Sequence, residues 1–240
     1  MTENVSEAEA IRIHNEYARR GRELPASRYT LRQPSAIFLR EGTGRLCLEA
    51  LEREGMLPLW DRKVADLGCG SGTWLLQLLL WGADPRNLFG IDLEEERIRR
   101  ARYKIPACDL RVGDIRNLPW PDASFDLLTQ FTVFTSILSE TVKKSAAAEM
   151  LRVLKPGGLV LWYDFRVDNP RNPNVRGIGA REIRSLFADC SVKLRSGTLA
   201  PPVARRTVPI SWILSLCLER IPFLRTHYVG TIRKPGGARR

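Results

Sequence analysis

Short apolar runs alternate with helical segments along the middle of the chain. The runs are KVADLG, NLFGIDL, ACDLRVGD, SFDLLTQF and LVLWYDF. Between them lie segments such as EEERIRRARY, which begins with acids and ends with arginines, as the helix dipole favours. Strand and helix alternate four times from Lys63 onward, which predicts an α/β fold with a parallel sheet covered by helices on both faces.

The first 60 residues have a different, helical pattern. Ser6 and Glu9 have the spacing of a capping box and predict a helix over about 6–20. A second helix is predicted over about 34–54. We expect one face of the first helix to carry Ile11, His14, Tyr17 and Ala18. This part of the chain is therefore predicted to be an N-terminal helical cap or lid.

The C-terminal third predicts an antiparallel edge to the sheet. A strand around 192–199 and the alternating segment THYVGTIRK are expected to pair with each other, with residues 200–225 as a helical insertion. Within the insertion a helix is predicted over 209–220, mostly apolar with a narrow polar stripe. This helix either packs on the sheet or covers an apolar pocket, and we expect packing. Residues 61–240 are therefore predicted to form one domain.

Composition restricts the class of protein. A chain of 240 residues with 44% apolar and 27% charged residues predicts one globular domain with an appendage. Five cysteines without a CxxC pair argue against a disulfide framework or a zinc site and favour a reducing cytosol. No export signal or membrane-spanning run is recognised, so we expect a cytoplasmic protein.

The net charge of +11 lies entirely in the last third of the chain. Residues 1–165 hold 23 basic and 23 acidic residues, whereas residues 166–240 hold 15 and 4. A concentrated positive charge favours an anionic partner, such as a phosphorylated small molecule, a nucleic acid or an acidic lipid surface. The alternative is that these residues only keep the surface soluble.

A glycine-rich turn carries the main chemical signal. In VADLGCGSG a predicted strand runs into three glycines with GxGxG spacing and then into a helix. Such a turn lets the backbone approach a ligand closely, but dinucleotide sites use the same physics. Here Asp66 precedes the first glycine by two residues. A carboxylate at that position repels a pyrophosphate and attracts an ammonium group, which favours a cofactor with an amino-acid part.

At this point the sequence resembles the class I S-adenosylmethionine (SAM)-dependent methyltransferases, over about Val64 to Asp164. The resemblance implies a Rossmann-like, seven-stranded, mostly parallel sheet. It also implies that the turn holds the amino-acid part of SAM, that Asp92 binds the ribose hydroxyls, and that Asp114 and Ile115 contact adenine. The cofactor residues it implies are Asp66, Gly68, Cys69, Gly70, Gly72, Asp92, Leu93, Asp114, Ile115 and Gln130. The resemblance further implies that the cofactor is SAM and the product S-adenosylhomocysteine, and we expect no metal.

Methyl transfer from a sulfonium is an in-line displacement that needs alignment and, for oxygen or carbon acceptors, a base. The predicted catalytic candidates are Asp164, Tyr163, Tyr17 and His14, with His227 and Tyr29 as weaker ones. Arginines near the site can clamp a carboxylate or phosphate. The predicted substrate-binding residues are Tyr29, Arg166, Arg176 and Arg205.

These patterns predict methylation of a small, anionic or phosphate- or lipid-linked acceptor, as in secondary metabolism. Arginines around an apolar helix would also suit peripheral contact with the inner surface of an acidic membrane. An RNA methyltransferase is the second hypothesis, although the fourth-strand region TQFTVF lacks the signature of amino-group methylation on bases. A protein that binds SAM without catalysis is the third.

Overall fold

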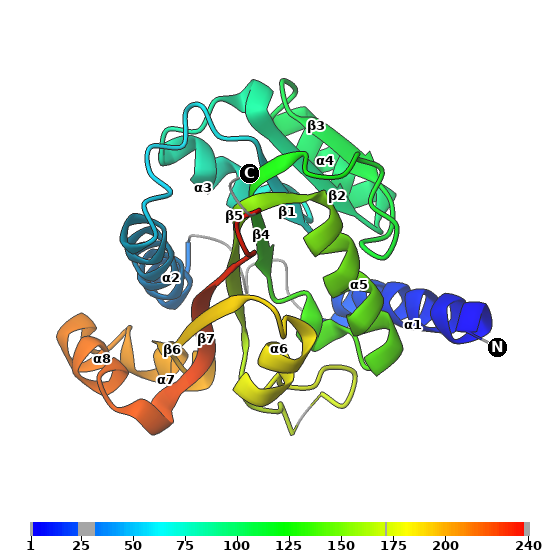
Figure 1. Ribbon diagram of the computed structural model, residues 1–240. Helices are drawn as coiled ribbons and strands as arrows, with labels where there is room; N and C mark the ends of the chain where they lie inside the picture. The colour runs from blue at the N-terminus through cyan, green and yellow to red at the C-terminus, as the bar shows by residue number, and fades with distance from the viewer. Residues whose placement is uncertain (1, 24–31, 171, 238–240) are drawn as a thin grey trace.

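A seven-stranded sheet forms the centre of the computed structural model, which describes residues 2–23, 32–170 and 172–237 (Figure 1). The strand order is β3-β2-β1-β4-β5-β7-β6. The first five strands are parallel, and β7 runs antiparallel to both β5 and β6. This arrangement confirms the predicted fold, including its antiparallel C-terminal edge. The strands are β1 (Val64–Leu67), β2 (Leu88–Asp92), β3 (Asp109–Val112), β4 (Phe125–Phe131), β5 (Leu154–Phe165), β6 (Ser191–Leu199) and β7 (Arg225–Arg233).

The central strands are buried on both faces, which explains their continuous apolar runs. All four residues of β1 are buried. Val64 belongs to the apolar core on one face of the sheet and Ala65 to the core on the other, and Leu127 and Leu128 of β4 divide in the same way. Successive side chains of a strand point to opposite faces, so each run supplies two cores.

Helices cover both faces of the sheet. The core of one face contains side chains from α2, α3 and α4, and the core of the other contains side chains from α5 and α6. The helices are α1 (Thr2–Glu23), α2 (Pro34–Arg53), α3 (Thr73–Leu80), α4 (Glu95–Lys104), α5 (Glu140–Val153), α6 (Ala180–Leu186), α7 (Pro201–Thr207) and α8 (Trp212–Glu219). Short 3₁₀ turns are η2 (Pro85–Asn87), η3 (Phe134–Ser136) and η4 (Pro222–Leu224).

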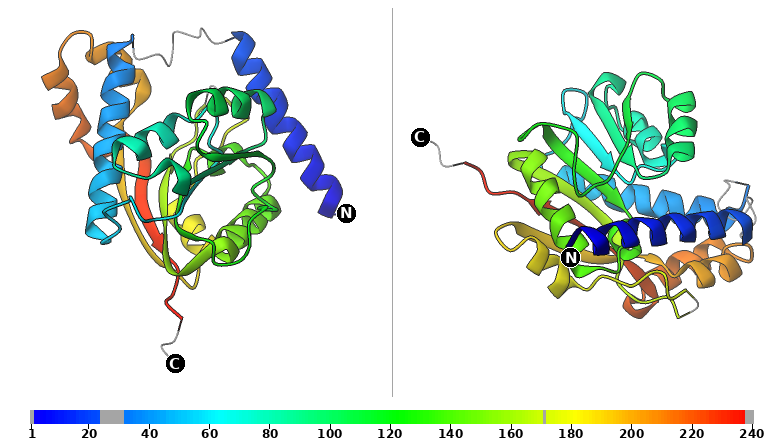
Figure 2. Two further views of the ribbon diagram at one scale, coloured as in Figure 1. Left: turned by 90° about the horizontal axis from the view of Figure 1, so that it is seen from above. Right: turned by 90° about the vertical axis from the view of Figure 1, so that its right-hand side faces the viewer.

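Helix α1 lies outside these layers, across one side of the molecule and apart from α2 (Figure 2). Its buried side differs from the predicted one. Ile13 packs with Ile137 and Val142, whereas Ile11 is 55% exposed. The prediction of Ile11 on the inner face was wrong because Glu9 and Glu16, which apolar periodicity assigns to solvent, are buried instead.

The segment between β6 and β7 holds two helices and η4, where the sequence predicted one helix. Pro209 lies in the break between α7 and α8, since proline cannot donate the hydrogen bond that a continuous helix needs. Helix α7 contacts α2, and α8 contacts α7 and β6. In the described part of the chain, no helix is both long and apolar enough to cross a membrane.

Glu54, which follows α2, ties that helix to the antiparallel edge of the sheet. Its carboxylate accepts hydrogen bonds from Lys193, Arg233 and Thr231, and Arg233 also donates to the Glu54 carbonyl. Burial alone would raise the pKa of Glu54, but these donors outweigh burial and lower it. The ion pairs therefore stabilise the fold while Glu54 is charged.

We expect Glu54→Ala to lower the free energy of unfolding by about 1–3 kcal/mol, because Lys193, Thr231 and Arg233 lose an acceptor that they share and that is largely buried. Since the folded-state pKa of Glu54 is lowered, its contribution is present above the unfolded pKa and is lost as the pH falls below it. Urea unfolding at pH 7 and pH 3 measures this difference. Glu52→Ala, an exposed change on the same helix, is the control. If the two substitutions change the free energy of unfolding equally at pH 7, the stabilising role of the Glu54 ion pairs is contradicted.

Candidate active site

The glycine turn after β1 is held against the end of β2. The backbone amides of Gly68 and Cys69 both donate to the Ile91 carbonyl, at 2.8 and 3.0 Å. Gly68 has a φ of +69°, and a Cβ atom there would lie 2.6 Å from Cγ2 of Val133. Only glycine fits this position, so the turn keeps bare backbone facing the space next to it.

Asp66 is buried beneath this turn. Its side chain accepts a hydrogen bond of 2.7 Å from the Thr129 hydroxyl, and the residue is 2% exposed. Burial raises the pKa of Asp66 to about 7; the Thr129 hydroxyl opposes this shift and the charge of Asp92 adds to it. A carboxyl group in this setting gains stability from any cation placed nearby.

Asp92, at the end of β2, connects the turn to the start of α4. One carboxylate oxygen accepts from the Gly70 amide at 2.8 Å, and the other accepts from the Glu94 amide at 3.0 Å. The Arg97 guanidinium lies 3.8 Å from the first oxygen. A carboxylate oxygen accepts more than one hydrogen bond, so both oxygens keep capacity toward a further pair of donors.

A cavity opens beside Asp92 at the carboxyl ends of β1, β2 and β4. Ligands bind at this end of the strands in parallel α/β sheets. The cavity is lined by residues of the turn, of the loops after β2, β3 and β4, and of α1, which are Glu9, Ala10, Ile13, Tyr17, Gly68, Asp92, Leu93, Glu94, Asp114, Ile115, Arg116, Phe131, Val133, Ser136, Ile137 and Val142. Apolar walls with a few acids suit a nucleoside.

Half of the predicted cofactor residues line this cavity: Gly68, Asp92, Leu93, Asp114 and Ile115. Asp114 also bonds the Arg116 side chain and amide. Asp66, Cys69, Gly70, Gly72 and Gln130 are not among the lining residues. Gln130 is fully buried and accepts from the Val133 amide at 3.1 Å, so it positions a lining residue instead of contacting the cavity.

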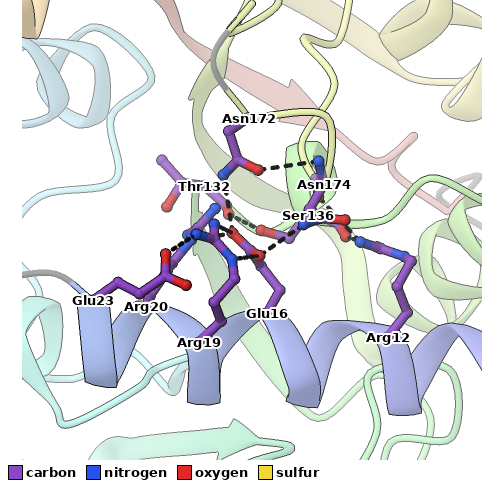
Figure 3. A network of polar contacts seen from close by, with 9 residues as sticks. All are labelled: Arg12, Glu16, Arg19, Arg20, Glu23, Thr132, Ser136, Asn172 and Asn174. Atoms are coloured by element: carbon purple, nitrogen blue, oxygen red, sulfur yellow. Dashed lines mark hydrogen bonds and ion pairs between the residues drawn. The ribbon is translucent and has the colours of Figure 1, made fainter.

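Helix α1 closes the cavity through buried polar anchors (Figure 3). The Glu16 carboxylate accepts hydrogen bonds from the side chains of Asn172 and Asn174 at 3.0 and 2.8 Å. Burial raises the pKa of Glu16, but hydrogen bonds from Arg19, Asn172 and Arg20 lower it to about 2. The anchor is therefore charged at neutral pH.

A second anchor lies one turn toward the N-terminus of α1. The Arg12 guanidinium donates to the carbonyls of Asn174 and Ser136, and the Glu9 carboxylate accepts from the Leu138 amide. These contacts join α1 to the loops that follow β4 and β5. Sequence periodicity missed this surface because its partners lie more than a hundred residues away in the chain.

Two predicted catalytic residues lie on α1. Tyr17 lines the cavity, and the Arg97 guanidinium lies 4.2 Å from the centre of its ring. The Nδ1 atom of His14 lies 2.7 Å from Oε1 of Glu94, but the His14 side chain is 63% exposed. Tyr17 therefore faces the candidate site, whereas His14 contacts its outer edge.

Asp164 and Tyr163, the other two predicted catalytic residues, are buried in the protein interior. Asp164 is fully buried and accepts from the Thr135 hydroxyl and amide. Burial raises the pKa of Asp164 to about 6, against the lowering effect of these bonds. Asp164 thus holds η3 in place through Thr135, and its side chain does not reach the cavity where an acceptor was predicted to bind.

Tyr163 belongs to a buried polar cluster between α2 and the antiparallel strands. Its hydroxyl lies 3.1 Å from the hydroxyls of Thr43 and Thr198, and its ring stacks on that of His227 at 4.6 Å. Burial raises the pKa of Tyr163 and lowers that of His227 to about 3. Neither residue lines the cavity, so their geometry is structural.

The predicted substrate residues are dispersed. Arg166 lies over the Tyr228 ring at 5.7 Å, and the Arg176 side chain is 51% exposed, 3.7 Å from Glu182. Arg176 is close to the site through its backbone, since its amide donates to the Thr135 carbonyl. Arg205 lies on α7, which supplies no residue to the cavity lining. Tyr29 lies outside the described residues. Among those described, no cluster of three or more His, Cys, Asp or Glu could hold a metal.

Comparisons with known proteins agree with this geometry. A family model described as a methyltransferase domain matches residues 64–158. A Mycolicibacterium smegmatis protein described as a "probable S-adenosylmethionine-dependent methyltransferase" is 31% identical over 52% of this chain and 50% of its own length. A phthiotriol/phenolphthiotriol dimycocerosates methyltransferase of Mycobacterium ulcerans is 31% identical over 47% of this chain and 41% of its own. The chain thus spans half or less of the length of these curated relatives.

Solved structures share the fold at lower identity. A SAM-dependent methyltransferase from Methanosarcina mazei has a TM-score of 0.58 and 18% identity, over 78% of this chain and 98% of its own. The [4+2]-cyclase SpnF has a TM-score of 0.58 and 21% identity, over 81% of each chain. The strand order and the glycine turn agree with the match of residues 64–158 to the methyltransferase-domain family model.

Proposed function

We propose that the protein transfers a methyl group from SAM to a small-molecule acceptor. The observation that carries the proposal is the cavity, which brings the glycine turn, Asp92 and Asp114 together under α1. A site with two acids and apolar walls matches a ligand that is both a nucleoside and a cation. These residues come from three successive strand ends, as the fold requires for a ligand that spans them.

The residues fit SAM part by part. The bare backbone at Gly68 and the buried carboxyl of Asp66 suit the amino-acid part. Asp92 offers two oxygens to two vicinal ribose hydroxyls. The apolar side chains of Leu93 and Ile115 suit the faces of adenine.

When bound, SAM supplies the activated methyl group and the leaving group. The contribution of this chain is to align the reactants and exclude water. Helix α1 helps to exclude water because Ile13 and Tyr17 form part of the cavity lining. Of the predicted bases that lie among the described residues, Tyr17 is the one that lines the cavity, and we favour it as the group that holds or accepts an acceptor proton.

We favour an anionic or phosphate- or lipid-linked acceptor, methylated on oxygen or carbon. The loop after β5 approaches η3 through Arg176, which carries a half-exposed guanidinium. A guanidinium on this loop suits a carboxylate or phosphate on the acceptor. The mycobacterial relative is named for phthiotriol and phenolphthiotriol dimycocerosates, which is consistent with a small-molecule acceptor here.

A second candidate function has its own support. The [4+2]-cyclase SpnF has the same fold, so the fold alone does not fix methyl transfer as the reaction. Cofactor binding without methylation, and an RNA acceptor bound by the basic C-terminal third, are both distinguishable from the first proposal. Incubation with SAM and candidate extracts, followed by mass spectrometry, tests them together. A gain of one methyl group on a small molecule supports our proposal, and methylated RNA would overturn its substrate class.

Replacing Asp92 tests the cofactor assignment. We expect Asp92→Ala to weaken the binding of S-adenosylhomocysteine by about 10- to 100-fold, because two hydrogen bonds to a charged acceptor are lost. Calorimetry with purified protein measures the affinity. Asp109→Ala removes an acid on the adjacent strand that does not line the cavity, and it should bind normally. Heat with NAD and none with SAM or S-adenosylhomocysteine would refute the assignment.

The pH dependence of binding tests Asp66. Because burial raises the pKa of Asp66 to about 7, the free protein holds a proton there in mildly acidic solution. An ammonium group binds the ionised form, so SAM affinity should rise as the pH increases through 7. Calorimetry in two buffers of different ionisation enthalpy should detect proton release. In Asp66→Asn the affinity should be weaker and the pH dependence flat.

The same group has the opposite effect on the stability of the free protein. A carboxyl whose folded-state pKa is raised contributes fully to the free energy of unfolding below its unfolded-state pKa. This contribution is lost as the pH rises through the folded-state pKa of about 7. Free Asp66→Asn should therefore unfold at higher denaturant than the parent at pH 8. If the parent protein is equally stable at pH 5 and pH 8 and its SAM affinity is the same at both, the role of Asp66 is contradicted.

A further inference from the structure

Helix α8 turns a polar stripe inward and leaves most of its large apolar side chains exposed, although Leu218 packs on the core and Trp212 contacts the Phe38 ring. Ser215 is fully buried, and its hydroxyl lies 2.8 Å from that of Thr207. Glu219 also turns inward and accepts from the Leu199 amide. In contrast, Ile213 is 74% exposed. A helix that covered a core by itself would show the reverse pattern.

Exposed apolar residues are concentrated on and beside α8. Twelve large apolar side chains are exposed among the described residues, and six of them lie between positions 210 and 223. Ile213 and Leu216 lie three residues apart on α8, Ile210 lies in the turn before it, and Phe223 lies in η4 after it. We call this surface the insertion face: Ile210, Trp212, Ile213, Leu214, Leu216 and Phe223. Apolar surface on this scale marks an interaction site.

Positive charge borders the insertion face at both ends. Arg206 precedes α8 and Arg220 follows it, and both are exposed. The single acid between residues 201 and 224 is Glu219, whose side chain is turned inward and is 12% exposed. The outward charges of this segment are therefore all positive.

This combination selects among the surfaces that could cover the face. In a symmetric contact with a second copy, the arginines of one face would oppose those of the other. RNA would pair with the arginines but would leave the apolar centre in water. An anionic bilayer satisfies both parts, since apolar side chains enter the acyl boundary while arginines contact lipid phosphates.

We propose that the insertion face is a membrane-docking surface for a bilayer that contains anionic phospholipid. Figure 1 shows α8 at the periphery of the molecule, outside α7 and away from the sheet centre. In Figures 1 and 2, α1 lies on the opposite side of the molecule from α8. A membrane bound at α8 thus leaves the α1-covered cavity free. The inference is independent of the proposed methyl transfer.

Flotation of the full chain with vesicles tests the proposal. The protein should float with phosphatidylcholine vesicles that contain about 30% phosphatidylglycerol and float poorly with phosphatidylcholine alone. The double variant Ile213→Ser and Phe223→Ser should partition on the order of tenfold less, because two exposed apolar side chains no longer enter the interface. Leu80→Ser, a change at a side chain 76% exposed on α3, is the matched control and should float like the parent.

A second variant separates charge from apolar contact. Arg206→Gln with Arg220→Gln should reduce flotation with anionic vesicles and remove the preference for them over neutral ones. Binding of S-adenosylhomocysteine by each variant reports that the fold is intact. Equal flotation of the parent and the serine variant would overturn the proposal. So would a dimer in sedimentation velocity that the serine variant dissolves while vesicles bind neither protein, since the face would then join two copies.

Discussion

The electrostatics of two buried acids at adjacent strand ends govern the site. Asp66 lies on β1 and Asp92 at the end of β2, and both are nearly inaccessible to water. Burial raises the pKa of Asp66, and the nearby charge of Asp92 adds to this shift. Asp92 has backbone donors and Arg97 beside it, whereas Asp66 has one hydroxyl. Asp66 is therefore the acid with fewer donors, and a cation placed beside it would lower the cost of ionising it.

The attachment of α1 follows a different principle from that of the other helices. Helices α2 to α6 bury apolar side chains against the sheet, but α1 buries Glu9 and Glu16 against loop amides and asparagine side chains. Such contacts are strong only when every partner is in place, because a buried unpaired carboxylate is costly. The position of α1 therefore depends on the loops after β4 and β5 being in place.

Much of the fold could be predicted from the sequence because each strand or turn has a recognisable pattern within a few consecutive residues. Strands β1, β2 and β4 are apolar runs, and the glycine turn needs φ values that few other residues adopt. The inner face of α1 could not be predicted, since the partners of Glu16 lie 156 and 158 residues away. The burial of Tyr163 and Asp164 away from the cavity could not be predicted from the sequence either. Position at a strand end does not reveal whether a side chain meets a cavity or a neighbouring helix.

The same reasoning explains why α8 was expected to pack on the sheet. Its composition is that of a core helix, and periodicity identifies an apolar face without identifying what the face contacts. The structure shows that the small polar stripe, with Ser215 at its centre, is the side that meets the protein. A stripe of serine and glutamate contributes little to an apolar core, but it can pack against the protein when each polar group has a hydrogen-bond partner. Here Thr207 is the partner of Ser215, and the Leu199 amide is the partner of Glu219. The apolar side is then left for an environment outside the chain, and the arginines at its two ends indicate the charge of that environment.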